Sequence, residues 1–135
     1  AKVQAKKLKI KAHFVKANSD KLPFKNNFFD REIAVAILHC IPEKKARQKT
    51  IKELYRVLKP KGKALITVWN KNSKRWKHKP KEVMAGWTTE KKKIYRYYYL
   101  YDLEELENEL KKVGFKTKCL NFSKEARNLV VEAEK

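Results

Sequence analysis

The sequence predicts an α/β fold, with a doubly wound and mostly parallel sheet that ends in an antiparallel strand. Three segments support this prediction. Residues 29–38 are mostly apolar, as in a parallel strand buried on both faces. Residues 43–69 change from a helical pattern through a tight turn to a strand. Residues 115–122 and 128–134 are two further strand-like segments, close enough in sequence to pair with each other.

The first 27 residues predict a helix, a short strand and a loop. Residues 1–12 alternate lysines with small and aliphatic residues, which indicates the end of a basic helix. Residues 13–17, HFVKA, predict a short strand. Residues 18–27 predict a loop, because Pro23 and the pair Asn26-Asn27 favour turns.

The central segment is the best defined. Pro42 and Glu43 suit the start of a helix over residues 43–58. Pro60 cannot continue that helix, and Gly62 permits the turn into a strand over residues 64–69. This order is typical of an α-to-β connection that leads into a central parallel strand. The helix places one apolar stripe toward the core: Ile51, Leu54, Tyr55 and Leu58.

The second half is less regular at first. Residues 70–89 show no clear period, and residues 95–101 are rich in tyrosine. Asp102 predicts an N-cap, with Glu105 three residues later completing a capping box, for a helix over residues 103–113. Gly114 ends that helix. No internal repeat or low-complexity linker interrupts the chain.

The charge of the chain points to a polyanionic partner. Its 135 residues suit one domain, and 35 Lys and Arg against 15 Asp and Glu give a net charge of +20. Nucleic acid is the first candidate and an anionic membrane surface the second. The alternative is a solvated surface in a Lys-rich proteome, for example that of a thermophile.

No membrane or secretory segment is predicted. The longest apolar run, residues 33–38, is far shorter than the roughly 20 residues that span a bilayer, and lysines interrupt residues 2–11. Cys40 and Cys119 are too few and too far apart to predict a disulfide framework or a zinc site. We therefore expect a cytoplasmic protein with two reduced thiols.

Four motifs resemble the class I S-adenosylmethionine (SAM) methyltransferases. RVLKPKGKALITVW, residues 56–69, is similar to their helix, "RVLKPGG" and strand signature. FVKANSDKLPF and NNFFDREIAVAILHCI resemble the segments before and within the fourth strand, and VGFK resembles the start of the sixth. The resemblance runs from about residue 1 to the end of the chain. It implies a Rossmann-like methyltransferase sheet and SAM as cofactor.

Within that superfamily, the chain is most similar to the tRNA wobble-uridine carboxymethyl methyltransferases and their archaeal relatives. This resemblance implies tRNA as a partner, with a small zinc-binding activator protein as another. Seven residues follow the pattern: Ala36, His39, Arg47, Trp69, Arg96, Tyr97 and Tyr98. Five depart from it: Cys40, Ala46, Lys61, Asn70 and Tyr99.

The Gly-rich loop that approaches SAM in this family is missing from the sequence. The only glycines are Gly62, Gly86 and Gly114, and the acidic residue expected to hold the ribose is also missing. We therefore expect residues 1–135 to form a single partial domain, the C-terminal half of the methyltransferase sheet, with an unpaired edge along residues 29–38. It would be a fragment, a split-gene half that associates with a complementary half or with itself, or a degenerate non-catalytic homologue.

The resemblance places the cofactor beside five residues: Asn18, Ser19, Val35, Ala36 and His39. Asn18 stands where the family has Asp, and its side-chain oxygen can accept a hydrogen bond from the adenine amino group. The alternative is that residues 18–20 form only a turn. His39 falls at the methyl-transfer pocket, although a histidine beside an apolar strand is often structural. Transfer to a carboxylate oxygen needs no base, so we predict no catalytic residue and no metal.

Eight residues are predicted to contact the substrate: His39, Arg47, Trp69, Arg75, Lys77, Arg96, Tyr97 and Tyr98. Residues 71–81, with Trp76, and residues 96–99 mix cations with flat aromatic rings, as single-stranded RNA sites do. Alternation in a strand would instead turn Tyr97 and Tyr99 inward and leave Tyr98 exposed.

The sequence is compatible with three functions. The first is a SAM-dependent tRNA methyltransferase, active with a complementary half, that modifies a wobble uridine. The second is a non-catalytic RNA-binding or scaffold subunit, which the missing Gly-rich loop favours. The third is a small-molecule methyltransferase, which the charge disfavours. The frame of motifs around LPF, FFD, LKPKG and TVW favours the enzyme.

Overall fold

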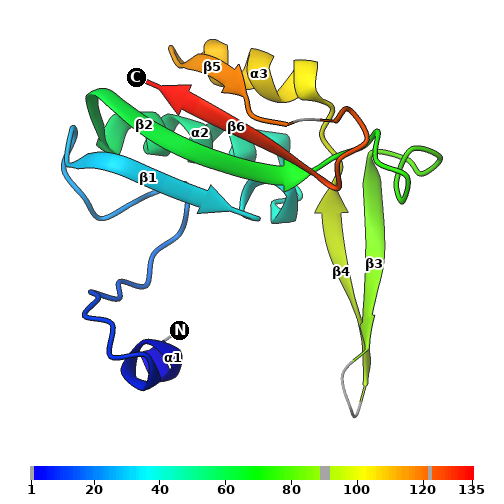
Figure 1. Cartoon of the computed structure of the whole chain (residues 1–135), viewed down its shortest axis with the longest axis horizontal. Coiled ribbons are helices and arrows are strands. Elements are labelled where there is room, and N and C mark those ends of the chain that lie inside the picture. The colour runs from blue at the N-terminus through cyan, green and yellow to red at the C-terminus, as the bar shows by residue number, and fades with distance from the viewer. Residues whose placement is uncertain (1, 89–91, 122) are drawn as a thin grey trace.

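A mixed four-stranded sheet forms the body of the chain, and a two-stranded hairpin extends from its end (Figure 1). The computed structural model describes residues 2–88, 92–121 and 123–135. The elements in chain order are α1 (Lys2–Lys7), β1 (Phe29–Val35), the 3₁₀ turn η1 (Leu38–Cys40), α2 (Lys44–Val57), β2 (Leu58–Trp69), β3 (Glu82–Thr88), β4 (Lys93–Tyr99), α3 (Leu103–Lys111), β5 (Lys116–Cys119) and β6 (Asn128–Glu134).

The strand order of the main sheet is β1-β2-β6-β5. β1 pairs with β2 in parallel, and β6 pairs antiparallel with both β2 and β5. Strands β1, β2 and β5 therefore run in one direction and β6 in the other. This confirms the predicted α/β sheet that is mostly parallel with an antiparallel last strand.

Helices α2 and α3 pack on one face of this sheet. Alternate residues of β2 and β6 point to them, including Ile66 and Val131, which are fully buried. α2 contributes Ile51 and α3 contributes Leu106 to the same core. The other face of β1 is open, because Ile33 is 72% exposed and Val35 is 56% exposed. The prediction that this strand is buried on both faces is wrong for the described chain, since nothing in the described residues covers the face to which Ile33 and Val35 point.

The turn predicted at Pro60–Gly62 lies inside β2. Lys61 has a φ of 62°, and its N–H donates to the Lys135 carbonyl at 2.8 Å, so the irregular backbone still pairs with the end of β6. A Cβ on Gly62 would lie 2.8 Å from the Lys59 carbonyl oxygen and 3.0 Å from that of Asp30. Glycine is therefore needed here for the close approach of β1 and β2.

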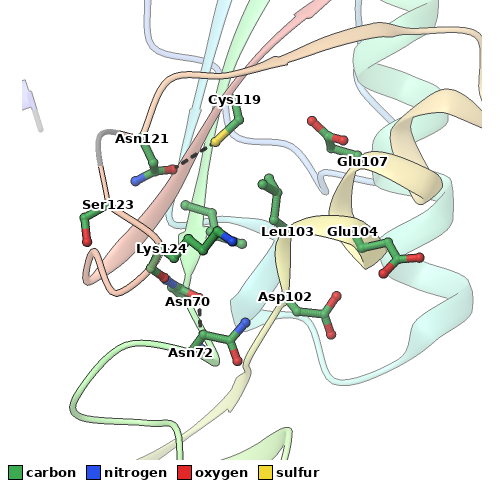
Figure 2. Close-up of a pocket in the computed structure, with 11 residues that line it drawn as sticks. Asn70, Asn72, Asp102, Leu103, Glu104, Glu107, Cys119, Asn121, Ser123 and Lys124 are labelled. Carbon is green, nitrogen blue, oxygen red and sulfur yellow. Dashed lines mark hydrogen bonds between the residues drawn. The ribbon is translucent and has the colours of Figure 1, made fainter.

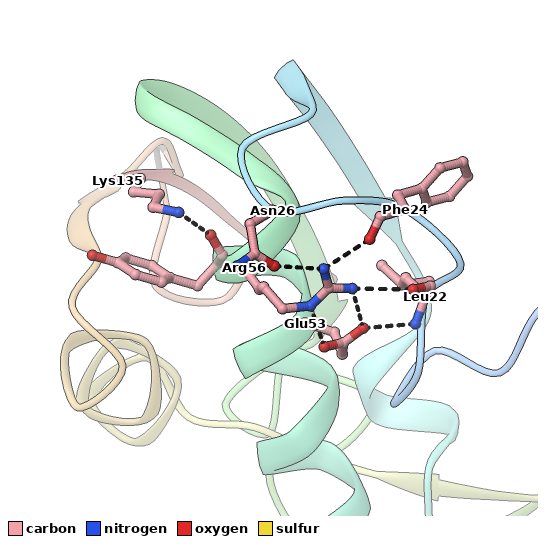
Figure 3. Close-up of polar contacts among 7 residues, drawn as sticks. Leu22, Phe24, Asn26, Glu53, Arg56 and Lys135 are labelled. Carbon is pink, nitrogen blue, oxygen red and sulfur yellow. Dashed lines mark hydrogen bonds and ion pairs between the residues drawn. The ribbon is translucent and has the colours of Figure 1, made fainter.

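An arginine-centred network fastens the loop of residues 18–27 to α2 (Figure 3). Arg56 donates to the carbonyl oxygens of Leu22 at 3.0 Å and Phe24 at 2.7 Å, and pairs with Glu53. Glu53 in turn accepts the Leu22 N–H at 2.7 Å. Arg56 also donates to the Asn26 side chain at 2.9 Å. This loop was predicted, and these contacts give it a fixed path.

Two other segments differ from the prediction. Residues 13–17 form no strand, because no strand among the described residues lies beside them to share a ladder. The irregular region predicted over residues 70–89 contains β3, which pairs with β4. Thr89, at the end of that region, and Phe122, at the end of the strand predicted over residues 115–122, lie outside the described residues.

The capped helix and the closing strands are confirmed. The Asp102 carboxylate accepts the Glu105 N–H at 2.9 Å, which caps α3 as predicted. Gly114, with a φ of 115°, follows that helix. β5 and β6 then pair as adjacent antiparallel strands. No helix in the described part of the chain is both long and apolar enough to cross a membrane.

The contact around Gly62 gives a first prediction. Gly62→Ala should lower the free energy of unfolding by about 1–3 kcal/mol, because the new methyl group would overlap backbone of β1 and β2. Gly86→Ala is the matched control, since its nearest neighbour is the flexible end of Lys93 at 3.1 Å. Urea unfolding measures both. Equal midpoints for the two variants would contradict this account of Gly62.

Candidate functional site at the end of strand β1

The candidate site begins where β1 ends. After Val35, the backbone of Ala36 turns through a left-handed conformation with a φ of 58°, and η1 follows. The Ala36 N–H donates to the Thr67 carbonyl at 3.2 Å, which ties the turn to β2. Both strands run parallel, so this turn lies at their carboxyl ends, the edge where open α/β sheets bind ligands.

His39 is buried in η1 and bound to β2. Its Nδ1 accepts the Trp69 backbone N–H at 3.1 Å, and its ring stacks on the Trp69 ring at 5.1 Å. Burial lowers the pKa of His39 to about 4, so the imidazole is neutral at pH 7. With Nδ1 accepting, the ring proton lies on Nε2. These contacts fit the structural role considered for His39, and its contact with cofactor or substrate stays a prediction.

An aromatic stack joins His39 to the base of the hairpin. Trp69 stacks on Tyr98 with ring centroids 4.1 Å apart and on Trp76 at 5.2 Å. All three rings are buried. The alternative in which alternation exposes Tyr98 is therefore wrong, because the hairpin packs against this stack at its base. Trp76 was expected to offer its ring to RNA, but the ring is buried and cannot stack on a base.

Arg47 is also buried, on α2. Its guanidinium donates to the carbonyl oxygens of Ile41 at 3.0 Å and Pro42 at 2.8 Å, and lies 3.8 Å from the centroid of the Tyr99 ring. Arg47 thus holds the segment after η1 against β4. A contact with substrate by Arg47 stays a prediction, and its Nε is buried without a hydrogen-bond partner among the described residues.

The predicted adenine-side residues form a turn docked on α2. The Asn18 carbonyl accepts the Lys21 N–H at 3.1 Å, and the Ser19 hydroxyl lies 3.0 Å from that of Thr50. Among the described residues, no hydrogen bond joins this turn to Ala36 or His39. The turn alternative is observed, and a role in adenine binding stays a prediction.

The remaining predicted substrate residues lie on the hairpin and the loop before it. Arg75 and Lys77 are exposed, and the Arg75 guanidinium lies 4.6 Å from the Trp76 ring centroid. Arg96 is exposed on β4, and its charge acts on the Cys40 thiol, whose pKa is raised by burial. Cys40 is therefore a protonated thiol at pH 7. Tyr97 is half-buried, with its hydroxyl 3.4 Å from the Pro42 carbonyl.

A separate hollow of about 710 Å³ lies between the start of α3 and the segment that joins β5 to β6 (Figure 2). Asn70 closes one side of it. The Asn70 amide donates to the carbonyl oxygens of Lys124 and Ala126, both at 2.8 Å, so it is fully used within the fold. None of the predicted cofactor or substrate residues lines this hollow.

Glu32 on β1 was not predicted as part of any site. Both of its carboxylate oxygens are buried without a hydrogen-bond partner, and burial raises its pKa to about 7. It lines a hollow of about 220 Å³ beside β1, with Leu22, Phe29 and Leu54. The signal in the sequence was an acid directly before the apolar run of residues 33–38. A buried carboxylate without a partner in the described chain is a place where a water, an ion or a neighbouring segment would bind.

Comparison with known proteins gives a family match for nearly half of the chain. The profile of the methyltransferase domain family matches residues 1–66. A candidate methyltransferase of Encephalitozoon cuniculi is 31% identical over 84% of this chain and 56% of its own length. The crystal structure of a SAM-dependent methyltransferase from Methanosarcina mazei has a TM-score of 0.72 at 22% identity, over 93% of this chain and 68% of that one. Residues 1–66 thus match the methyltransferase domain family, and the fold is the one found in SAM-dependent methyltransferases.

A tRNA enzyme also matches a shorter part of this chain. The tRNA (carboxymethyluridine(34)-5-O)-methyltransferase of Arabidopsis thaliana is 45% identical over 53 residues, which is 39% of this chain and 13% of that enzyme. The chain thus spans about half of one curated relative and a small part of the other. β1, η1 and α2 lie within the family match, and the hairpin lies beyond it.

The shifted pKa values of His39 and Glu32 give a second prediction. The His39 pKa falls from 6.5 to about 4, so the unfolded chain binds more protons between these values and stability falls as the pH is lowered. The Glu32 pKa rises from 4.5 to about 7, so the folded chain binds more protons there and stability falls as the pH is raised. The two effects oppose each other between pH 4.5 and 6.5.

Glu32→Gln should therefore expose the effect of His39. The free energy of unfolding of this variant should fall on acidification from pH 6.5 to 4.5 more steeply than that of the wild type, by at most about 1.4 kcal/mol per pH unit. The partly solvated position of Glu32 reduces that figure. Urea unfolding over this pH range measures it, with the exposed Glu104→Gln as control. Equal slopes for Glu32→Gln and the wild type would contradict the assignment.

Proposed function

We propose that this chain forms part of a SAM-dependent methyltransferase that acts on tRNA, at a modified wobble uridine of the anticodon loop. The observation that carries the proposal is the left-handed turn at Ala36, which leads into η1 at the carboxyl ends of β1 and β2. The fold shared with the Methanosarcina mazei protein supports methyl transfer at that edge. The name of the Arabidopsis thaliana relative supports the tRNA substrate.

The residues present suit one end of the cofactor. Among the described residues, no hydrogen bond engages the side-chain amide of Asn18, so its oxygen is available to accept the adenine amino group. Ser19 would offer its backbone N–H to the same ring. Val35, Ala36 and His39 would line the side from which the methyl group is transferred. SAM supplies the electrophilic methyl group when bound.

Methyl transfer to a carboxylate requires the protein to position the substrate and does not require a general base. A carboxylate oxygen is already a nucleophile at pH 7, so the site has only to hold it in line with the sulfonium methyl group. The neutral, internally bonded His39 is consistent with a positioning role. Neither His39 nor the protonated Cys40 is assigned a proton transfer in this scheme.

The free edge of β1 supports a second element of the proposal. Ile33 and Val35 are exposed there, and Glu32 is unsatisfied beside them. A Gly-rich segment, in the same polypeptide or in another, would pair with β1 and complete the cofactor pocket. A second copy of this chain and a small zinc-binding activator protein are the other partners considered. We place the complex in the cytoplasm, where the two free cysteines would stay reduced.

SAM binding tests this dependence. The dissociation constant of SAM for the chain alone should lie above the low-micromolar range, because no Gly-rich loop contributes to the pocket. The Gly-rich half can be added as a separate polypeptide, for example the part of the Encephalitozoon cuniculi protein outside the match. Isothermal titration should then detect SAM binding, and labelled SAM should transfer its methyl group to tRNA. Ile33→Asp should leave the lone chain folded and prevent this gain, since Ile33 is 72% exposed. Low-micromolar binding by the chain alone would contradict the proposal.

A non-catalytic RNA-binding subunit is the second candidate function. The observation that favours it is the absence of a Gly-rich loop from the sequence, which contains three glycines only. Under this alternative, tRNA binding would persist and no partner would produce methyl transfer.

The salt dependence of RNA binding gives a further prediction. Each phosphate neutralised on a single strand makes the fall of log affinity with log salt steeper by roughly 0.7. Replacing the exposed Arg75 and Lys77 with Ala should therefore reduce the slope by about one to two units for all RNAs alike. Lys111→Ala with Lys116→Ala removes the same charge on α3 and β5 and should leave the slope unchanged. Equal slopes for both double variants would show that only the net charge matters.

A further inference from the structure

The β3–β4 hairpin extends away from the sheet as a separate ribbon (Figure 1). Each strand has seven residues, so the ribbon is roughly 24 Å long. Its base is embedded in the body, because Tyr98 and Tyr99 are buried. Its outer part, residues 86–88 and 93–96, is exposed, and the hairpin lies outside the residues that match the methyltransferase domain family.

The strand register assigns the outer side chains to two faces. Ala85 lies opposite Arg96 and Trp87 opposite Ile94, so these four residues share one face. Gly86 lies opposite Tyr95 on the other face. We name the first of these the Trp87 face. The two faces differ in how firmly their aromatic ring is held.

Trp87 is held in one orientation. Its Nε1–H donates to the Tyr98 hydroxyl at 2.9 Å, and the Tyr98 ring stacks on Trp69 at 4.1 Å. The indole is nevertheless 45% exposed. A half-exposed ring whose polar edge is already bonded offers a ligand its flat surface only. The entropy of fixing that ring is lost on folding, before any ligand arrives.

The charge beside this ring is positive. Arg96 is exposed on the Trp87 face, and Lys93 is exposed toward the tip of β4. Glu82, at the base of β3, is the only acidic residue among the described residues of the two strands. A flat aromatic surface next to a guanidinium is the combination by which proteins hold unpaired nucleotides, through base stacking and phosphate contact.

We infer that the Trp87 face binds single-stranded RNA, with an unpaired base stacked on Trp87 and a neighbouring phosphate neutralised by Arg96. This inference rests on the proposed function for the identity of the RNA, an anticodon loop. It adds a binding site on the hairpin, and Arg96 connects this site to the turn at Ala36, because its charge also acts on the Cys40 thiol beside that turn. The net charge of +20 favours this occupant over a protein with a basic surface.

Stacking and charge can be measured separately. Binding of a labelled anticodon stem-loop to the full chain should weaken about tenfold or more in Trp87→Ala, with an unchanged salt slope, because stacking releases no counterions. Trp87→Phe should recover most of that loss. Arg96→Ala should lower the salt slope by roughly 0.7. Tyr95→Ala is the matched control, since Tyr95 is 57% exposed on the opposite face of the same strand.

The outcomes separate this inference from the proposed function. Wild-type affinity in Trp87→Ala, an equal loss in Tyr95→Ala, or an equal loss for a fully duplex RNA would overturn the stacking site. The first of these leaves methyl transfer to tRNA untouched. A specific loss in Trp87→Ala would support the site even if the completed enzyme transferred no methyl group to tRNA. Circular dichroism of each variant shows whether the hairpin and body remain folded.

Discussion

The hydrogen bond from the Trp69 N–H to the His39 imidazole joins the two halves of the candidate site. It fastens the turn after β1 to the end of β2, and the stack of Trp69 on Tyr98 extends that connection to the hairpin. A protonated His39 could not accept this bond, and burial keeps the ring neutral. The turn and the hairpin therefore share one aromatic support.

Much of the fold could be predicted from local patterns. The 3.6-residue period predicted α2 and the cap at Asp102 predicted α3, because both signals are contained in a few consecutive residues. β3 was missed, since its sequence EVMAGWT lacks a clear alternation and its pairing with β4 is what forms it. The exposure of β1 could not be predicted from its apolar residues, because burial of a face depends on a covering layer that the pattern does not specify.

The candidate site could be located but not described from the sequence. Motif resemblance led to Ala36 and His39, and both lie at the carboxyl ends of parallel strands. The internal contacts of Arg47 and the burial of Tyr98 were not foreseeable, because they depend on partners far away in the chain. Charge and aromatic content alone did not separate Trp76, which is buried, from Trp87, which is half-exposed.

The Arg56 network fixes the loop beside β1 without using the edge at which the proposed partner would pair. Because Arg56 and Glu53 hold Leu22 and Phe24 from α2, the loop beside β1 is ordered by contacts that do not involve the free edge. An incoming strand would meet a surface that is already shaped. Completion of the sheet would then proceed as docking of preformed parts, at a rate set by collision and orientation rather than by folding of this loop.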